Sequence, residues 1–499
     1  MTDRVVVLRG TYRDSVSLMQ LSREVLKLPG VTEVAVLTAT PLNQDLIAGQ
    51  GFVLPDDLSP EDLVVAVRGS TPDQTAGAVA EVHRRLSERP PGRPERSAEV
   101  EPRTFRSAAR NDPSLNLAMV SVPDQHAAYE TQAALDANLN VFCFSSGVSL
   151  EDEVALKRRA DLSDLLLMGP DCGTAILDGT GYGFANAVAR GPVGIVAASG
   201  TGIQQTCCLL DESNVGISQA IGVGSRDLSD EVGGIMTRRA LRLLASDDRT
   251  QIILLLSKPP GLATRDRVAG WIGETGKKGV VAFLGLDHGP MGLERSVEVV
   301  TSLERAAQRG AELAGGQWHD PPLPEISPTG GFVRGLFSGG SLCYEALAEM
   351  AGALGQVRSN TPLQPGWPAV DVGNPEGHAF IDFGHEDLTR GRPHPMIDPS
   401  LRNARFVEDA RDPYVGTIVM DVILGSGAHP DPADDLGPLI ETARRTRGPS
   451  LAVIVALCGT EGDPQGYEPQ RRRLEAAGAI VTRSAARAAR VALQAVAND

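Results

Sequence analysis

The chain has 499 residues, a formal net charge of −16 and a pI near 5.1, with 42% hydrophobic, 22% charged and 4% aromatic residues. This length predicts two to four domains with a large buried core. The negative charge argues against nucleic acid and anionic membranes as partners, because both bind positively charged protein faces. No apolar window reaches the roughly 18 to 20 residues that span a bilayer, so we expect a cytoplasmic protein.

Residues 1–90 predict a small α+β module of the ferredoxin-like or ACT-like kind. Its strands and helices are expected in the order strand, helix, strand, strand, helix, over residues 5–8, 15–28, 31–38, 63–67 and 74–86. Modules of this kind often bind effectors or dimerise. Residues 91–113 are rich in proline and charge and have no apolar periodicity, which predicts a linker.

The remaining sequence predicts a multi-domain α/β protein with parallel sheets. Short buried strands alternate with amphipathic helices over residues 114–190, which indicates a Rossmann-like segment. The same alternation over residues 191–316 predicts a doubly wound, flavodoxin-like domain, and residues 330–499 repeat it. We infer an internal duplication, with an insertion near residues 355–377 of the second copy.

Each copy begins with a strand, a Gly-Ser loop and a helix. The first reads VAASGTGIQQTCCLL from residue 196, and the second reads GLFSGGSLCYEALAEM from residue 335. Helix N-termini carry free N–H groups and a positive dipole end, so small residues there suit a bound phosphate. The predicted phosphate-binding residues are Ser199, Gly200, Thr201, Gly202, Ser338, Gly339, Gly340 and Ser341. The alternative for either loop is an ordinary structural N-cap.

These segments carry a family resemblance. The stretch GPVGIVAASGTGIQQTCCLLDESNVGISQAIGVGSRDLSDEVGGI resembles the α subunit of succinyl-CoA synthetase, and the second copy resembles the carboxyl domain of its β subunit. The preceding segment, with GPDCG, is similar to that enzyme's CoA-binding domain. With GSRDLSDEVGG and TRGRPHPMIDPSLRN, the whole chain beyond the linker resembles the FdrA family.

The resemblance implies acyl or carbamoyl chemistry without a phosphohistidine. In succinyl-CoA synthetase the phosphorylated histidine lies in a Gly-His-Ala-Gly context, whereas His288 of this chain lies in GLDHGPMG, too early and without that pattern. The Gly-Phe-Thr-Gly nucleotide loop, an ATP-grasp domain and a GxxxxGK[ST] loop are also not recognisable. FdrA-family members resemble subunits of a carbamoyltransferase that interconverts oxalurate plus phosphate with oxamate plus carbamoyl phosphate. An acyl-CoA synthetase that binds CoA and nucleotide, and a non-enzymatic regulatory scaffold, remain as alternatives.

Further candidates lie in loops after predicted strands. Arginine forks bind phosphate or carboxylate, and histidine polarises carbonyls or transfers protons. The predicted catalytic residues are Arg226, Arg390, Arg392 and His394. The predicted substrate-contacting residues are Cys172, Asp227, Lys258, Asp387, Thr389, Gly425, Ser426, His429 and Thr460. Solvated charges, helix caps and surface loops are the structural alternatives for these positions.

The six cysteines are scattered through apolar segments and form no metal-ligand spacing, so we expect reduced core thiols and no metal site. No cofactor is firmly implied. Phosphate or carbamoyl phosphate is expected as a substrate, with CoA as an option. We expect a small-molecule substrate, other subunits of a transferase complex and a homo-oligomer as partners.

Overall fold

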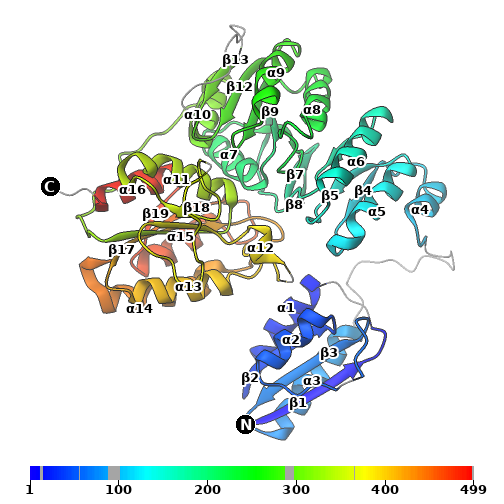
Figure 1. The fold of residues 1–499 in the computed structure, drawn as a ribbon, viewed down its shortest axis with the longest axis vertical. Coiled ribbons are helices and arrows are strands. Elements are labelled where there is room, and N and C mark those ends of the chain that lie inside the picture. Colours follow the sequence, from blue (N-terminus) through cyan, green and yellow to red (C-terminus); the bar gives the residue numbers. More distant parts are fainter. Residues whose placement is uncertain are drawn as a thin grey trace. The chain divides into compact units, whose positions relative to one another are not determined.

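The computed structural model describes residues 1–496 except 12–14, 56, 88–101, 287–296, 365 and 391. The chain divides into two compact units (Figure 1). The smaller one holds the N-terminal module together with residues 390–393, and the larger one holds the rest. No helix among the described residues is long and apolar enough to cross a membrane.

The N-terminal module is a three-stranded antiparallel sheet in the order β1-β3-β2, with helices between and after its strands. Its elements are β1 (Thr2–Leu8), α1 (Ser15–Leu26), β2 (Val31–Thr38), α2 (Pro41–Gly49), β3 (Leu63–Gly69) and α3 (Pro72–Ser87). The predicted α+β module is confirmed. Helix α2 was not predicted; proline at its first position is compatible with a helix start because that N–H has no intrahelical partner.

A small parallel sheet in the order β4-β5-β6 follows. Its elements are α4 (Phe105–Asn111), β4 (Leu117–Val120), α5 (Asp124–Asp136), β5 (Asn140–Cys143), α6 (Leu150–Leu162) and β6 (Leu167–Met168). Helix α4 lies in the segment predicted as linker, where Thr104 and Ser107 form a reciprocal capping box. The remainder of that segment through residue 101 lies outside the described residues.

The first large sheet has seven strands in the order β13-β12-β11-β9-β10-β7-β8. Its elements are β7 (Thr174–Leu177), β8 (Thr180–Gly183), β9 (Arg190–Ala197), α7 (Gly200–Glu212), β10 (Ile217–Gly222), α8 (Ile235–Ser246), β11 (Ile252–Ser257), α9 (Leu262–Gly273), β12 (Lys278–Phe283), β13 (Val297–Val300) and α10 (Leu303–Leu313). Strands β7 and β8 form an antiparallel hairpin on the edge of this sheet, although their residues were assigned to the Rossmann-like segment.

The second large sheet is parallel, with six strands in the order β15-β16-β14-β17-β18-β19. Its elements are β14 (Phe332–Phe337), α11 (Gly340–Leu354), β15 (Arg358–Ser359), β16 (Ala379–Asp382), α12 (Glu386–Thr389), α13 (Ser400–Arg411), β17 (Val415–Ile423), α14 (Pro432–Arg447), the 3-10 turn η1 (Gly448–Ser450), β18 (Ala452–Cys458), α15 (Tyr467–Ala476), β19 (Ile480–Thr482) and α16 (Ala485–Val496).

The two large sheets share one topology. The order β13-β12-β11-β9-β10 matches β19-β18-β17-β14-β16, so β9 with α7 corresponds to β14 with α11. Helices α7 and α10 on one sheet face α11 and α16 on the other (Figure 1). Buried side chains of these helices, such as Ile203, Leu347 and Ala488, belong to a single apolar cluster. Burial of this shared interface fixes the two copies against each other.

Glu345 links helices α10 and α11 inside this interface. Its side chain is buried, and its Oε1 atom accepts hydrogen bonds from the amides of Leu303 at 2.6 Å and Glu304 at 3.3 Å. Its Oε2 atom has no hydrogen-bond partner among the described residues. Burial raises the pKa of Glu345 to about 8, and the nearby Glu304 carboxylate adds to the shift.

This raised pKa predicts a pH-dependent stability. The native state keeps a proton on Glu345 that the unfolded chain loses above its ordinary pKa of 4.5. This group therefore leaves the free energy of unfolding unchanged below pH 4.5 and lowers it as pH rises from 4.5 to about 8, by up to ~1.4 kcal/mol per pH unit. Glu345→Gln should remove this slope in urea unfolding curves measured across that range.

The exposed Glu274→Gln variant is the matched control and should keep the wild-type slope. Equal slopes for wild type and Glu345→Gln would contradict the assignment.

Candidate active site

The first Gly-Ser loop connects β9 to α7. Ser199 is the N-cap of α7 in an extended conformation, and its Oγ atom accepts a hydrogen bond from the Gly202 amide at 2.8 Å. A Cβ atom on Gly202 would lie 2.6 Å from that Oγ, so only glycine fits there. Strand β9 is thus followed, at the carboxyl edge of its sheet, by a capped helix N-terminus.

The second loop meets the first directly. Helix α11 begins at Gly340, and the Ser199 hydroxyl donates a hydrogen bond to Ser341 Oγ at 2.6 Å. A Cβ atom on Gly339 would lie 2.9 Å from Thr201 Cγ2, which shows how closely the backbones approach. The two loops therefore converge.

Four backbone amides at this junction remain open. Within the described part of the chain, the N–H groups of Gly200, Thr201, Gly340 and Ser341 have no acceptor. Ser199, Gly200 and Gly340 are partly exposed, so solvent or a ligand reaches this point. Two positive helix ends with unused donors form an arrangement suited to an oxyanion.

Ser338 and Gly339 require a correction. Their amides donate to Asp421 Oδ1 and Oδ2, both at 2.8 Å, so these two N–H groups are not available to a phosphate. Asp421 lies on the neighbouring strand β17 and is fully buried, and burial raises its pKa to about 6. Arg402 holds this carboxylate with an Nη1–Oδ1 distance of 3.2 Å and also donates to Ser338 Oγ at 2.8 Å.

The first copy lacks this internal carboxylate. In the strand registers, Leu336 pairs with Met420 and Val196 pairs with Leu255, so the position of Asp421 corresponds to the buried Leu256. An apolar side chain has no acceptor atom and cannot accept hydrogen bonds from the amides of the first loop. The duplicated loops therefore differ in chemistry: one is open, and the other is partly closed by its own carboxylate.

Lys258 and Asp382 lie beside the open amides. A Cβ atom on Gly340 would be 3.3 Å from Lys258 Nζ and 2.5 Å from Asp382 Oδ2. Lys258 is half-buried and has no ion pair within 4.0 Å among the residues that the structure describes. Burial raises the pKa of Asp382, while the Lys258 charge opposes the shift. Sequence reasoning proposed Lys258 but missed Asp382, although a carboxylate ending the apolar strand AFID was a usable signal.

His394 lies next to the second loop in a neutral state. Its ring packs against Phe184 with centroids 5.4 Å apart, and its Nδ1 atom accepts from the Met396 amide at 3.2 Å. Burial lowers the pKa of His394 to about 4. The remaining proton is therefore on Nε2, near Gly384, where an added Cβ would lie 2.9 Å away. His394 can donate a hydrogen bond at neutral pH but carries no charge.

Arg226 and Asp227 differ in role. The Asp227 carboxylate is fully buried, pairs with Lys157 at 2.8 Å and accepts from the Thr237 amide at 2.8 Å. The predicted substrate contact of Asp227 is corrected to a structural one, because a buried lysine requires a partner. Arg226 pairs with Glu153 at 2.8 Å, and its side chain remains 42% exposed.

Among the other predicted contacts, Cys172, His429 and Thr460 are buried, whereas Ser426 is exposed. The buried Cys172 thiol donates to backbone oxygens, and burial raises its pKa far above the ordinary value, so it is not a reactive thiolate. The Ser426 amide donates to Ala185 O at 2.9 Å, and Thr460 Oγ1 donates to Ala187 O at 2.7 Å. The Gly425 amide donates a hydrogen bond to Gln465 Oε1. His429 Nε2 lies 3.1 Å from Asp435 Oδ2.

The remaining predicted residues lie in α12 and directly after it. Asp387 is exposed and lies 3.5 Å from His385, and Thr389 Oγ1 donates to the backbone of His385. Arg390 and Arg392 are exposed and fall in the segment grouped with the N-terminal unit. His288 lies within residues 287–296, outside the described residues.

Two family models match the chain. The AllF heavy metal-associated domain matches residues 1–102, and the CoA-ligase family matches residues 336–495. The second match includes β14's last residues and helices α11 to α16, so one of the paired loops lies in a CoA-ligase domain.

Relatives match at different lengths. The protein is 37% identical to YahF of Escherichia coli K12 over 504 residues, covering 97% of this chain and 96% of YahF. It is 29% identical to the α subunit of ADP-forming succinate–CoA ligase of Staphylococcus epidermidis over 213 residues, covering 42% of this chain and 65% of that subunit. The dinucleotide-forming acetyl-coenzyme A synthetase 1 of Ca. Korarchaeum cryptofilum aligns over 75% of this chain and 81% of its own, with 17% identity and a TM-score of 0.32.

The N-terminal module does not fit a heavy-metal ion. Soft metals select thiolate and thioether ligands, but residues 1–102 contain no cysteine, a single histidine, His83, and two methionines, Met1 and Met19. Directly after β1, Arg9 pairs with Asp57 at 2.6 Å and Asp62 at 2.7 Å. No cluster of potential metal ligands occurs among the described residues of either unit. The matched fold therefore lacks the donor set that its description implies.

Gly340→Ala tests the open-amide site. The new methyl group would collide with Asp382, whose Oδ1 is fixed by the Gly384 amide at 2.9 Å, and would displace Lys258 Nζ. We expect phosphate affinity, measured by calorimetry, to fall at least ~10-fold. Gly352→Ala in the same helix meets nothing within 4 Å and is the control. Equal phosphate affinities in both variants would contradict this site.

Proposed function

Because the chain belongs to the YahF family of FdrA-like proteins, which has a succinyl-CoA synthetase-like fold, we propose that it transfers acyl groups by way of an acyl phosphate bound at the paired helix N-termini. The junction of α7 and α11 is the observation that carries this proposal. Four open amides and the unpaired Lys258 ammonium meet there among the described residues. Such donors stabilise phosphoryl oxygens without further rearrangement.

The chemistry follows from this arrangement. A nucleophilic acceptor attacks the carbonyl carbon of the acyl phosphate, and the carbon–oxygen bond to the phosphoryl group breaks. The electron pair remains on the departing phosphate, which takes up the proton of the acceptor. The amides of Gly200, Thr201, Gly340 and Ser341, with Lys258, bind the increasing negative charge on that phosphate. His394 Nε2–H is a candidate donor to a substrate oxygen.

The thiol of CoA is the first candidate acceptor. The CoA-ligase match over residues 336–495 supports this choice, since that family is defined by the CoA-ligase reaction. The product would then be an acyl thioester plus phosphate, and the reverse reaction would form an acyl phosphate from phosphate. Other protein subunits that supply the acceptor site are part of this proposal.

Oxamate is the second candidate acceptor, with carbamoyl phosphate as the donor. The sequence GLDHGPMG favours it, since the expected carrier-histidine pattern is missing and a free acyl phosphate must then enter as substrate. This reaction uses the same phosphate site. The two candidates differ only in the acceptor and the acyl group.

The decisive assay follows phosphate release from acetyl phosphate and carbamoyl phosphate, with CoA or oxamate as acceptor, with and without co-purified partner proteins. CoA-dependent release supports the acyl-CoA synthetase class, and oxamate-dependent release from carbamoyl phosphate supports the transferase. Failure of both acceptors, in the presence of partners, would contradict acyl transfer.

Lys258→Ala should lower kcat by roughly 100-fold in whichever reaction is active, because removing one charge-stabilising donor costs about 2.7 kcal/mol. Lys278→Ala, on an exposed position of β12, is the control and should keep the wild-type rate. Equal rates in the two variants would remove Lys258 from the mechanism.

A further inference from the structure

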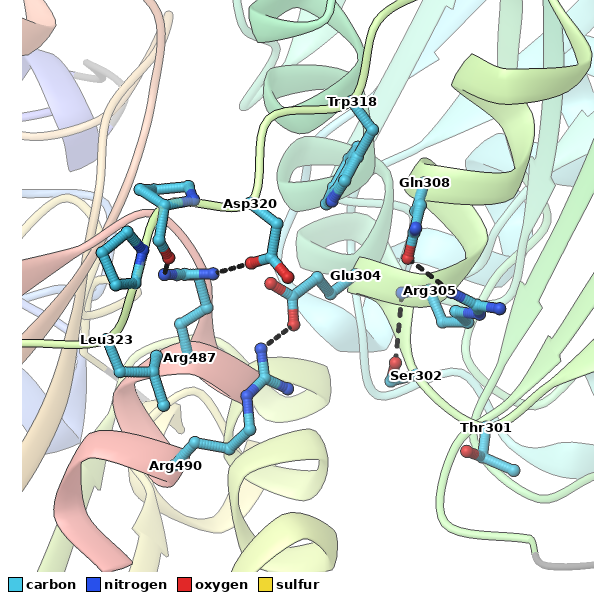
Figure 2. A pocket seen from close by; sticks show the side chains of 12 residues that line it. Thr301, Ser302, Glu304, Arg305, Gln308, Trp318, Asp320, Leu323, Arg487 and Arg490 are labelled. Atoms are coloured by element: carbon cyan, nitrogen blue, oxygen red, sulfur yellow. Dashed lines mark hydrogen bonds and ion pairs between the residues drawn. The ribbon is translucent and has the colours of Figure 1, made fainter. Parts of the chain in front are cut away.

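A cavity of about 520 Å³ lies away from the paired loops, where the segment connecting the two copies passes over helices α10 and α16 (Figure 2). Residues around the start of α10 form one wall, the connecting segment contributes Trp318 and residues 320–323, and α16 contributes Arg487 and Arg490. The cavity thus exists because the two copies are joined in one chain. Its size is in the range of small-molecule sites.

The cavity is lined by an excess of cationic donors. Arg305, Arg487 and Arg490 face two carboxylates, Glu304 and Asp320, in a chain whose overall charge is −16. Arg487 pairs with Asp320, and Arg490 pairs with Glu304 (Figure 2). Arg490 also lies 3.5 Å from Glu349, so Arg305 is the lining arginine that keeps no carboxylate partner among the described residues. Its charge favours an anionic ligand.

Arg305 is the donor with spare capacity. Its side chain is exposed, and its acceptor among the described residues is the neutral Gln308 Oε1 at 2.7 Å. A guanidinium carries five N–H donors, so most of those on Arg305 remain for a ligand. The Ser302 hydroxyl lies on the same wall, where it caps α10. A planar fork of this kind binds a phosphate through two parallel N–H···O bonds, as it does a carboxylate.

The opposite part of the lining suits a flat, weakly polar group. Trp318 is half-buried and points its indole ring toward Glu304 and the cavity (Figure 2), and Pro321, Pro322 and Leu323 add apolar surface. Aromatic rings stack on nucleobases with a useful gain in binding energy. We propose that this cavity is a binding site for a nucleoside monophosphate, with the base on the Trp318 side and the phosphate at Arg305. This proposal does not depend on acyl transfer at the paired loops.

Titration of the full chain with AMP, adenosine and inorganic phosphate tests the proposal, read by calorimetry and tryptophan fluorescence. We expect saturable AMP binding, with adenosine and phosphate each at least ~10-fold weaker. Arg305→Ala should weaken AMP binding ~10-fold, and its exposed position leaves folding intact. Trp318→Ala should weaken it similarly and remove the fluorescence change.

Arg309→Ala is the matched control. Arg309 lies one turn further along α10, pairs with Glu298 and Glu312, and does not line the cavity. The Arg309→Ala variant should bind AMP as the wild type does. Ser199→Leu at the paired loops should also bind AMP as the wild type does. The proposal would be overturned if AMP showed no saturable binding, or if Arg305→Ala and Trp318→Ala left AMP binding unaffected. It would also be overturned if Ser199→Leu lost AMP binding, or if phosphate bound as tightly as AMP.

Discussion

The approach of two helix N-termini is the constraint on which the centre of the larger unit depends. Each helix end carries about half a positive charge, so α7 and α11, joined by the Ser199–Ser341 contact at 2.6 Å, place like charges together in a partly buried site. Such an arrangement persists only where negative charge compensates it. Asp421 supplies that compensation on the side of α11, with Asp382 nearby, whereas the side of α7 has no corresponding carboxylate on the matching strand positions.

The asymmetry between the two copies follows from single positions in matching strands. Asp421 on β17 corresponds to Leu256 on β11, and Asp382 on β16 corresponds to Gly222 on β10. Both carboxylates thus belong to the second copy, whereas Lys258, which follows β11, belongs to the first. The site at the interface therefore combines an amide-rich, cationic half with an acidic half. Two loops without a carboxylate would place two uncompensated helix dipoles together. Two loops with a carboxylate would leave fewer free amides for a ligand.

The alternation of apolar runs with helical patterns predicted the large sheets and their two strand–loop–helix units, because such units are encoded locally. The hydrogen bonds from the Ser338 and Gly339 amides to Asp421 could not be predicted in this way. Asp421 lies 83 residues from Ser338 in the apolar run TIVMDVILGSG, and its role depends on which strands become neighbours. The same applies to Asp227, whose partner Lys157 comes from the preceding small domain. The hairpin β7–β8 was not predicted, because its two strands have only four residues each and β8 contains two glycines, which gives a weak pattern.

One buried side chain, Glu345, joins the helix that begins at the paired loops to the helix that lines the cavity. Glu345 lies on α11, five residues after the helix begins at the paired loops, and holds the first amides of α10, whose Glu304 lines the connecting-segment cavity. Because its second oxygen lacks a partner, this bridge is not locked by a full set of hydrogen bonds. The fusion of the two copies in one chain places that contact between the helix ends that carry the chemistry and the segment that joins them.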